Sequence, residues 1–236
     1  ISAIATAAAT NMEHCDVVLA ELGDLAKGVD LSSSDLKHAD DRVEGLLGAS
    51  ETLIKAIAES GVETSDTPFI QAAVETAAKV GEAFEAAIER GEITEQQLFE
   101  PNYREIEGTN PKQYLSSYVE LTDRILPPIQ DPVQKMDPRV MFSVAWARDG
   151  YLPTHNPNYR HPQGDDPVWN AANCRNRRIF KDRAAEKVAN STTPFLLQTY
   201  RRDMGNGQFV LLKDASAPIR IRGRHWGCFR IGFRQS

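Results

Sequence analysis

The sequence is poor in cysteine and lacks the motifs of the common catalytic sites. Its 236 residues include three cysteines, Cys15, Cys174 and Cys228, which are far apart and form no C-x-x-C pair. This spacing excludes a zinc ribbon and a covalently attached haem, and it is typical of a reducing compartment. The chain also has no G-x-S-x-G, H-E-x-x-H, Walker or G-x-G-x-x-G motif. We therefore expect a protein that is not an enzyme.

Long hydrophobic runs are also missing. No apolar run approaches the roughly 18 residues needed to cross a bilayer. The N-terminal segment ISAIATAAATNMEH has no basic region before its mildly apolar stretch, so it does not resemble a signal peptide. We expect no membrane span and a cytoplasmic location.

The net charge of −6 conceals a division along the chain. Residues 1–138 carry 10 Lys and Arg against 26 Asp and Glu, whereas residues 139–236 carry 17 against 7, which gives net charges of −16 and +10. Fourteen of the 17 cations in the second half are arginines, which favour bidentate contacts with carboxylates and phosphates. The basic half could pair with acidic helices of its own chain, bind an anionic ligand or, less in keeping with the rest of the sequence, bind nucleic acid.

The N-terminal region has a heptad pattern of small and medium apolar residues, which predicts a tightly packed helix pair or bundle. A polar segment, residues 30–34, interrupts the pattern, and a second helix is expected to follow in a new phase and end near Gly61. Two such helices from each of two chains would make a four-helix bundle, so we expect homodimerisation through residues 1–60. The first seam comprises Ile1, Ala5, Ala8, Met12, Cys15, Leu19, Leu22, Ala26 and Val29, and the second helix carries Val43, Leu46, Leu47, Ser50, Leu53, Ile54 and Ile57.

Three further helices are predicted before residue 128. Thr67 as N-cap and Pro68 at the first helical position begin a helix that ends near Gly91. Thr94 to Gln97 has the form of a capping box and begins a short helix. After a loop over 101–108, a helix from Asn110 is expected to end at Pro127 and Pro128. The apolar stripe of the first of these helices comprises Ile70, Val74, Ala77, Val80, Phe84 and Ile88.

The periodicity then becomes that of strands. We predict a strand over 140–148, a turn at Asp149 and Gly150, a short return strand over 151–154, a long loop over 155–167, and an interrupted helix over 169–187. The last forty residues predict three more strands, with His225 and Trp226 in a hairpin, and hence a five-stranded antiparallel sheet covered on one face. Its apolar face would carry Ile219, Ile221, Phe229, Ile231 and Phe233, and its cationic face Arg220, Arg222, Arg230 and Arg234.

Five blocks resemble the sensory region of bacterial methyl-accepting chemotaxis proteins that carry a cytoplasmic PAS or Cache-like sensor. They are EGTNPKQYLSSYVELTDRILPPIQ, DGYLPTHN, DPVWNAANCRNRRIF, PFLLQTYRRDMG and GRHWGCFRIGF. The resemblance implies an α+β protein in which helices for dimerisation and signalling, residues 1–108, precede a PAS/Cache-like sensory domain, residues 109–236. It also implies contact with a chemotaxis kinase and coupling protein only through a signalling region whose E-A-A-R-A-G-E type motif does not occur here.

A PAS-like sheet holds its ligand between the sheet and the covering segment, so polar and aromatic residues there are candidates for binding. The candidate ligand-binding residues are Tyr151, His155, Trp169, Asn170, Asn173, Arg177, Arg178, Gln198, Tyr200 and Lys213. Because Arg175, Arg177 and Arg178 follow Asn170 and Asn173, we expect an anionic small molecule. As an alternative, His155, His161 and Cys174 could form a haem site, which would make the protein a haem-based redox or gas sensor.

Overall fold

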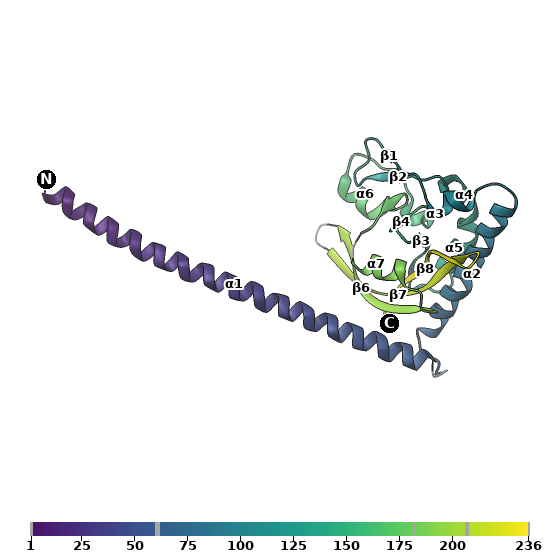
Figure 1. Cartoon of the computed structure of the whole chain (residues 1–236), viewed down its shortest axis with the longest axis horizontal. Helices are drawn as coiled ribbons and strands as arrows, with labels where there is room; N and C mark the ends of the chain where they lie inside the picture. The colour runs from purple at the N-terminus through teal and green to yellow at the C-terminus, as the bar shows by residue number, and fades with distance from the viewer. Residues whose placement is uncertain (1, 60–61, 182, 206–207, 236) are drawn as a thin grey trace. The chain divides into compact units, whose positions relative to one another are not determined.

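The computed structural model describes residues 2–59, 62–181, 183–205 and 208–235, and its compact part is an α+β fold (Figure 1). In chain order the elements are α1 (Ser2–Glu59), α2 (Thr67–Glu89), α3 (Glu95–Phe99), β1 (Arg104–Ile106), β2 (Gln113–Leu115), α4 (Val119–Ile125), α5 (Pro127–Gln134), β3 (Val140–Ala147), β4 (Tyr151–Leu152), the 3₁₀ helix η1 (Pro157–Tyr159), α6 (Pro167–Asn173), β5 (Arg178–Ile179), α7 (Arg183–Asn190), β6 (Leu196–Gly205), β7 (Gln208–Ile221) and β8 (Arg224–Arg234).

Helix α1 is one continuous helix of 58 residues, so the predicted interruption over 30–34 is wrong. The seven-residue spacing explains why: counting on from Leu22 and Val29 leads to Leu36 and Val43, so the seam keeps its phase. Serine is tolerated inside a helix, and no proline stops it here. A helix hairpin within residues 1–60 is therefore excluded, and each chain offers one long helix.

The contacts divide the chain into two units, residues 1–50 and residues 51–236. Residues 51–108, which the sequence analysis assigned to the helical region, belong to the second unit. The reason is α2, whose side chains Phe69, Val80 and Phe84 are fully buried in the core of the compact unit. Val74, expected on the buried stripe, is 41% exposed because Ala73 takes the inward position instead.

The main sheet has four antiparallel strands in the order β3-β8-β7-β6, not the five that the sequence predicts. Strand β4 leaves β3 and pairs with β5 in a separate two-stranded sheet. Tyr151 explains this departure, because its hydroxyl donates to the carbonyl oxygen of Tyr114 at 2.8 Å. Gly150 lies at φ 86° directly against the carbonyl of Phe180, a position that only glycine fits.

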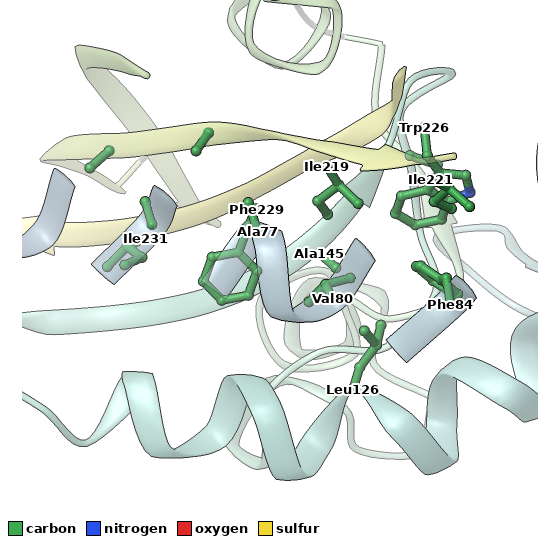
Figure 2. Packing of buried hydrophobic residues seen from close by; sticks show 14 of the residues in the cluster. Ala77, Val80, Phe84, Leu126, Ala145, Ile219, Ile221, Trp226, Phe229 and Ile231 are labelled. Carbon is green, nitrogen blue, oxygen red and sulfur yellow. The ribbon is translucent and has the colours of Figure 1, made fainter. Parts of the chain in front are cut away.

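Both faces of the main sheet are covered. On the first face, α2 and Leu126 at the start of α5 pack on the apolar side chains of β7 and β8, as Figure 2 shows for Val80, Phe84, Ile219 and Phe229. All five residues of the predicted apolar face are in this core. The second face carries a smaller cluster with Phe142, Val144, Trp146, Leu212, Cys228, Val188 and Ala189.

The second face is therefore not the exposed cationic surface that the sequence predicts. Arg230 is buried there against Asp214, while Arg220 and Arg222 remain exposed. Positive φ values at Arg222 and Gly223 make the β7–β8 turn. His225 and Trp226 thus lie in the β7–β8 hairpin, as predicted, at the start of its second strand.

The boundaries of several other elements differ from the predicted ones. The N-cap of α2 is Asp66, one residue before Thr67. The capping box of α3 at Thr94 and Gln97 is present, as predicted. The expected helix from Asn110 is instead β2 followed by α4, and Pro127 begins α5 because proline is favoured in a first helical turn.

The expected interrupted helix over 169–187 divides into α6, β5 and α7. Arg177, at φ 61°, turns the chain between α6 and β5. The segment Met204 to Gly207 has the composition of a tight turn between strands, and its residues 206 and 207 lie outside the described residues.

Candidate functional site

The predicted binding residues separate into groups with different surroundings. Lys213 points to the first face of the sheet, where its Nζ lies 2.7 Å from a carboxylate oxygen of Asp66. Arg177 pairs with Asp123 of α4 at 2.7 Å, and Asp123 also accepts a hydrogen bond from Thr154. Each of these two cations therefore has a carboxylate partner within the chain, and the two ion pairs do not form a common site on the second face.

A second group holds the long loop against α6. The Asn170 side chain is buried, accepts from the Gly164 N–H and donates to the carbonyls of Asn110 and Gly164. The Cys174 thiol donates to the carbonyl of Pro162 at 3.4 Å, and burial raises its pKa. Asn173 donates to the carbonyl of Trp169 on its own helix. These bonds make Asn170 and Cys174 structural anchors of the loop.

The histidines of the haem alternative are packed against aromatic rings. His155 is buried, with its ring centroid 4.9 Å from that of Tyr159 and 6.1 Å from that of Phe142. His161 lies 5.8 Å from Trp169, which is 44% exposed. Among the described residues, no group of three or more His, Cys, Asp and Glu side chains could hold a metal ion.

The second face of the sheet carries a row of polar side chains that crosses all four strands. Gln198 of β6 and Arg230 of β8 both donate to the same oxygen of Asp214 of β7, Gln198 at 3.3 Å and the Arg230 Nε at 3.0 Å. The Arg230 guanidinium also lies over the Trp146 ring of β3, 4.4 Å from its centroid. Tyr200 lies opposite Leu212 in the register, and its side chain is outside the described residues.

This row is the part of the site that sequence reasoning missed. Asp214 is fully buried, and neither its Oδ1 nor the Nε1 of Trp146 has a hydrogen-bond partner among the described residues. Burial raises the pKa of the neighbouring Cys228 thiol to about 12, so this cysteine stays protonated and inert at neutral pH. The only sequence signal was an arginine in an otherwise apolar strand.

A cluster of cations lies on the covering segment, next to this row. Arg175 and Arg178 both donate to the carbonyl oxygen of Ala171, at 3.3 and 3.1 Å. Both guanidinium groups also lie over the ring of Phe180, at 4.9 and 4.7 Å, and Phe180 in turn packs on Trp146. The two guanidinium groups thus lie side by side against one carbonyl oxygen and one aromatic ring.

Arg178 is the member of this cluster with the clearest electrostatic imbalance. Burial lowers its pKa to about 10, which means that its charge has lost solvation without full compensation. No acidic side chain of the described chain forms an ion pair with it. Because the group is only half-buried, an anion could reach it from solvent. We take the Arg175–Arg178–Phe180 cluster as the candidate ligand contact.

Among the described side chains, most other arginines of the basic half form an ion pair within the chain. Arg224 contacts Glu95 of α3 at 2.5 Å, and the same carboxylate lies 3.6 Å from Arg222. The backbone N–H of Arg222 donates to Glu85 of α2. These contacts favour the first interpretation of the charge division, in which basic strands dock on acidic helices.

Comparisons of the chain with family models, with curated proteins and with solved structures found no match. Within the described residues, none of the helices is long and apolar enough to cross a membrane.

Proposed function

We propose that the chain is a cytoplasmic signal-sensing module that binds a small anionic ligand in its compact unit and dimerises through α1. The observation that carries this proposal is the apolar seam of α1. Leu19 is 66% exposed, Leu36 71% and Val43 53%. Leu36 and Val43 occupy one of the two seam positions of the heptad, and Leu19 occupies the other. Such a seam is stable in water when a second helix covers it.

The ligand contact follows from the Arg175–Arg178–Phe180 cluster. An anion bound at Arg178 would supply the electrostatic compensation that this half-buried charge lacks and accept charge-assisted hydrogen bonds, each contributing about 1.5–3 kcal/mol. Arg178 belongs to β5 and Arg175 to the segment after α6, so the ligand would link the covering segment to the sheet through Phe180 and Trp146.

The PAS or Cache-like interpretation is part of the same proposal. An antiparallel sheet with a covering segment on one face and a long helix ahead of it supports this interpretation, together with the five sequence blocks. In this view the kinase and coupling protein are reached through a signalling region outside the present sequence. The ligand must bind two arrangements of the α1 pair with different affinity, because equal affinity shifts no equilibrium.

Cys15 provides the test of dimerisation. It is exposed and lies on the seam, whereas Cys174 and Cys228 are buried. In a parallel, in-register pair the two Cys15 side chains face each other, so mild oxidation should produce a disulfide-linked dimer, and C15S should abolish it. A chain that sediments as a monomer at tens of micromolar and never cross-links would contradict the proposal.

The ligand part is tested with a thermal-shift screen of organic acids, amino acids and nucleotides. A stabilising anion should lose its effect in R178Q and keep it in R104Q, whose arginine is exposed on β1. The rate of Cys15 cross-linking should change when that anion is added. If stabilisation persists in R178Q and in R177A, the ligand contact is elsewhere. An absorption spectrum with a Soret band would instead favour the haem alternative.

A further inference from the structure

A cavity of about 310 Å³ lies at the end of the main sheet where β3 ends and β8 begins, and its lining includes no member of the Arg175–Arg178–Phe180 cluster. Its volume is at the lower end of the range for small-molecule sites, about 300–1,000 Å³. The walls come from α3, the end of β3, the end of α7 and the start of β8. The lining residues that matter here are Phe99, Arg148, Asp149, Asn190, His225 and Trp226.

The apolar wall of the cavity consists of rings that are held in place. The Trp226 indole N–H donates to the carbonyl of Leu98 at 3.1 Å, and its ring packs on Phe84 at 4.8 Å. Arg224 lies 4.0 Å over the ring of Phe99. A wall fixed in this way loses little conformational entropy when a flat apolar group packs on it.

The rim carries a cation whose charge is not neutralised. Arg148 contacts the Asn190 side-chain oxygen at 3.5 Å, the limit of a hydrogen bond, and no described carboxylate forms an ion pair with it. The neighbouring Asp149 is already engaged, since its two oxygens accept from the Tyr103 hydroxyl at 2.5 Å and from the Tyr151 N–H at 3.1 Å. The group at the rim that can still bind a ligand is therefore Arg148, and the ligand group that it favours is an anion.

His225 lies in the wall of the cavity with a neutral ring. Burial, with a smaller effect of the charges of Arg148 and Arg220, lowers the pKa of this imidazole, and its hydrogen bond with the Gly227 backbone opposes that shift only in part. The Nε2 is buried without a hydrogen-bond partner in the described structure, so the single N–H of the neutral ring is on Nδ1, and His225 offers the ligand no donor.

We propose that this cavity is a second binding site, which takes a small aromatic carboxylate. The ring packs against Phe99 and Trp226, and the carboxylate accepts hydrogen bonds from Arg148. The two kinds of group, an aromatic wall and a cation at its rim, together match this class of ligand. The site is independent of whether α1 dimerises.

Benzoate and benzamide are the matched probes, because they share the ring and differ in charge. We expect benzoate to raise the melting temperature of the full chain in a concentration-dependent way, as binding to the folded state requires, and benzamide to have a smaller effect. In R148Q the dissociation constant for benzoate, measured by calorimetry, should rise about tenfold or more.

Two further variants separate this site from the proposed sensor site. R104Q should bind benzoate like the wild type, and so should R178Q. Loss of binding in R178Q with retention in R148Q would assign benzoate to the Arg175–Arg178–Phe180 cluster, which overturns this inference and leaves the proposed function standing. Equal binding by R148Q and wild type, or no binding of benzoate at millimolar concentrations, would also overturn it.

Discussion

Helices α1 and α2 have apolar residues at similar helical spacing but opposite surroundings. In α2, Phe69, Val80 and Phe84 are fully buried against the main sheet. In α1, Leu19, Leu22 and Leu36 are between 54% and 71% exposed. The stability of α2 thus comes from its own chain, whereas α1 needs a surface that the described residues do not supply.

The largest effect is expected when the seam of α1 is made acidic. In L19D/L22D each dimer loses four buried leucines, at about 1.5–3 kcal/mol each, and gains charge repulsion. We expect the double variant to sediment as a monomer. Because both residues are exposed in the single chain, the melting temperature of the compact unit should stay near that of the wild type at low protein concentration. Dimerisation that survives the change would exclude this seam as the interface.

Removing a buried ring from α2 should destabilise the compact unit. Phe84 contacts the Trp226 ring at 4.8 Å and is fully buried, so F84A should lower the free energy of unfolding by about 3–5 kcal/mol. V74A on the same helix is the control, since Val74 is 41% exposed and should cost far less. Chemical denaturation monitored by tryptophan fluorescence measures both. Equal losses in the two variants would contradict the burial of this stripe.

Local signals in the sequence were sufficient for the elements that depend on neighbouring residues. Thr67-Pro68 marked the start of α2 within one residue, Thr94 and Gln97 formed the expected capping box, and the alternating residues of β8 predicted its core face. Such signals work because caps and strand periodicity are set by residues a few positions apart. The α+β class followed from them.

Pairing between distant residues could not be predicted. Arg230 looked like a surface residue because its partner, Asp214, is on a neighbouring strand whose register the sequence does not give. Strand β4 was assigned to the main sheet because the bond from Tyr151 to Tyr114 spans 37 positions. Arg148 and His225 were not recognised as lining one cavity for the same reason, because they are 77 positions apart in the sequence.

The polar positions of the seam offer a smaller test of the α1 interface. Continuing the heptads places two polar residues on the seam, Ser33 between Val29 and Leu36 and Asp40 between Leu36 and Val43. Polar residues at seam positions set register at a cost in stability. D40L should therefore strengthen the dimer, lowering its dissociation constant by about tenfold or more through leucine burial. D41L, one position off the seam, should not, and equal gains in both would argue against the seam.

The smallest expected effect is on the pH dependence of the melting temperature, to which a histidine of the compact unit should contribute and a histidine of α1 should not. His225 has its pKa lowered from 6.5, chiefly by burial, so the unfolded chain binds a proton at a higher pH than the folded chain does. Its contribution to stability is then complete above about pH 6.5 and is lost as the pH falls through the lower folded-state value. We expect the melting temperature to decline less between pH 7 and pH 5 in H225Q than in the wild type. H14Q, which removes an exposed histidine of α1, is the matched control and should follow the wild-type profile. If H225Q and the wild type decline in parallel, the imidazole is not desolvated, and the cavity is more open to water than the burial of its Nε2 indicates.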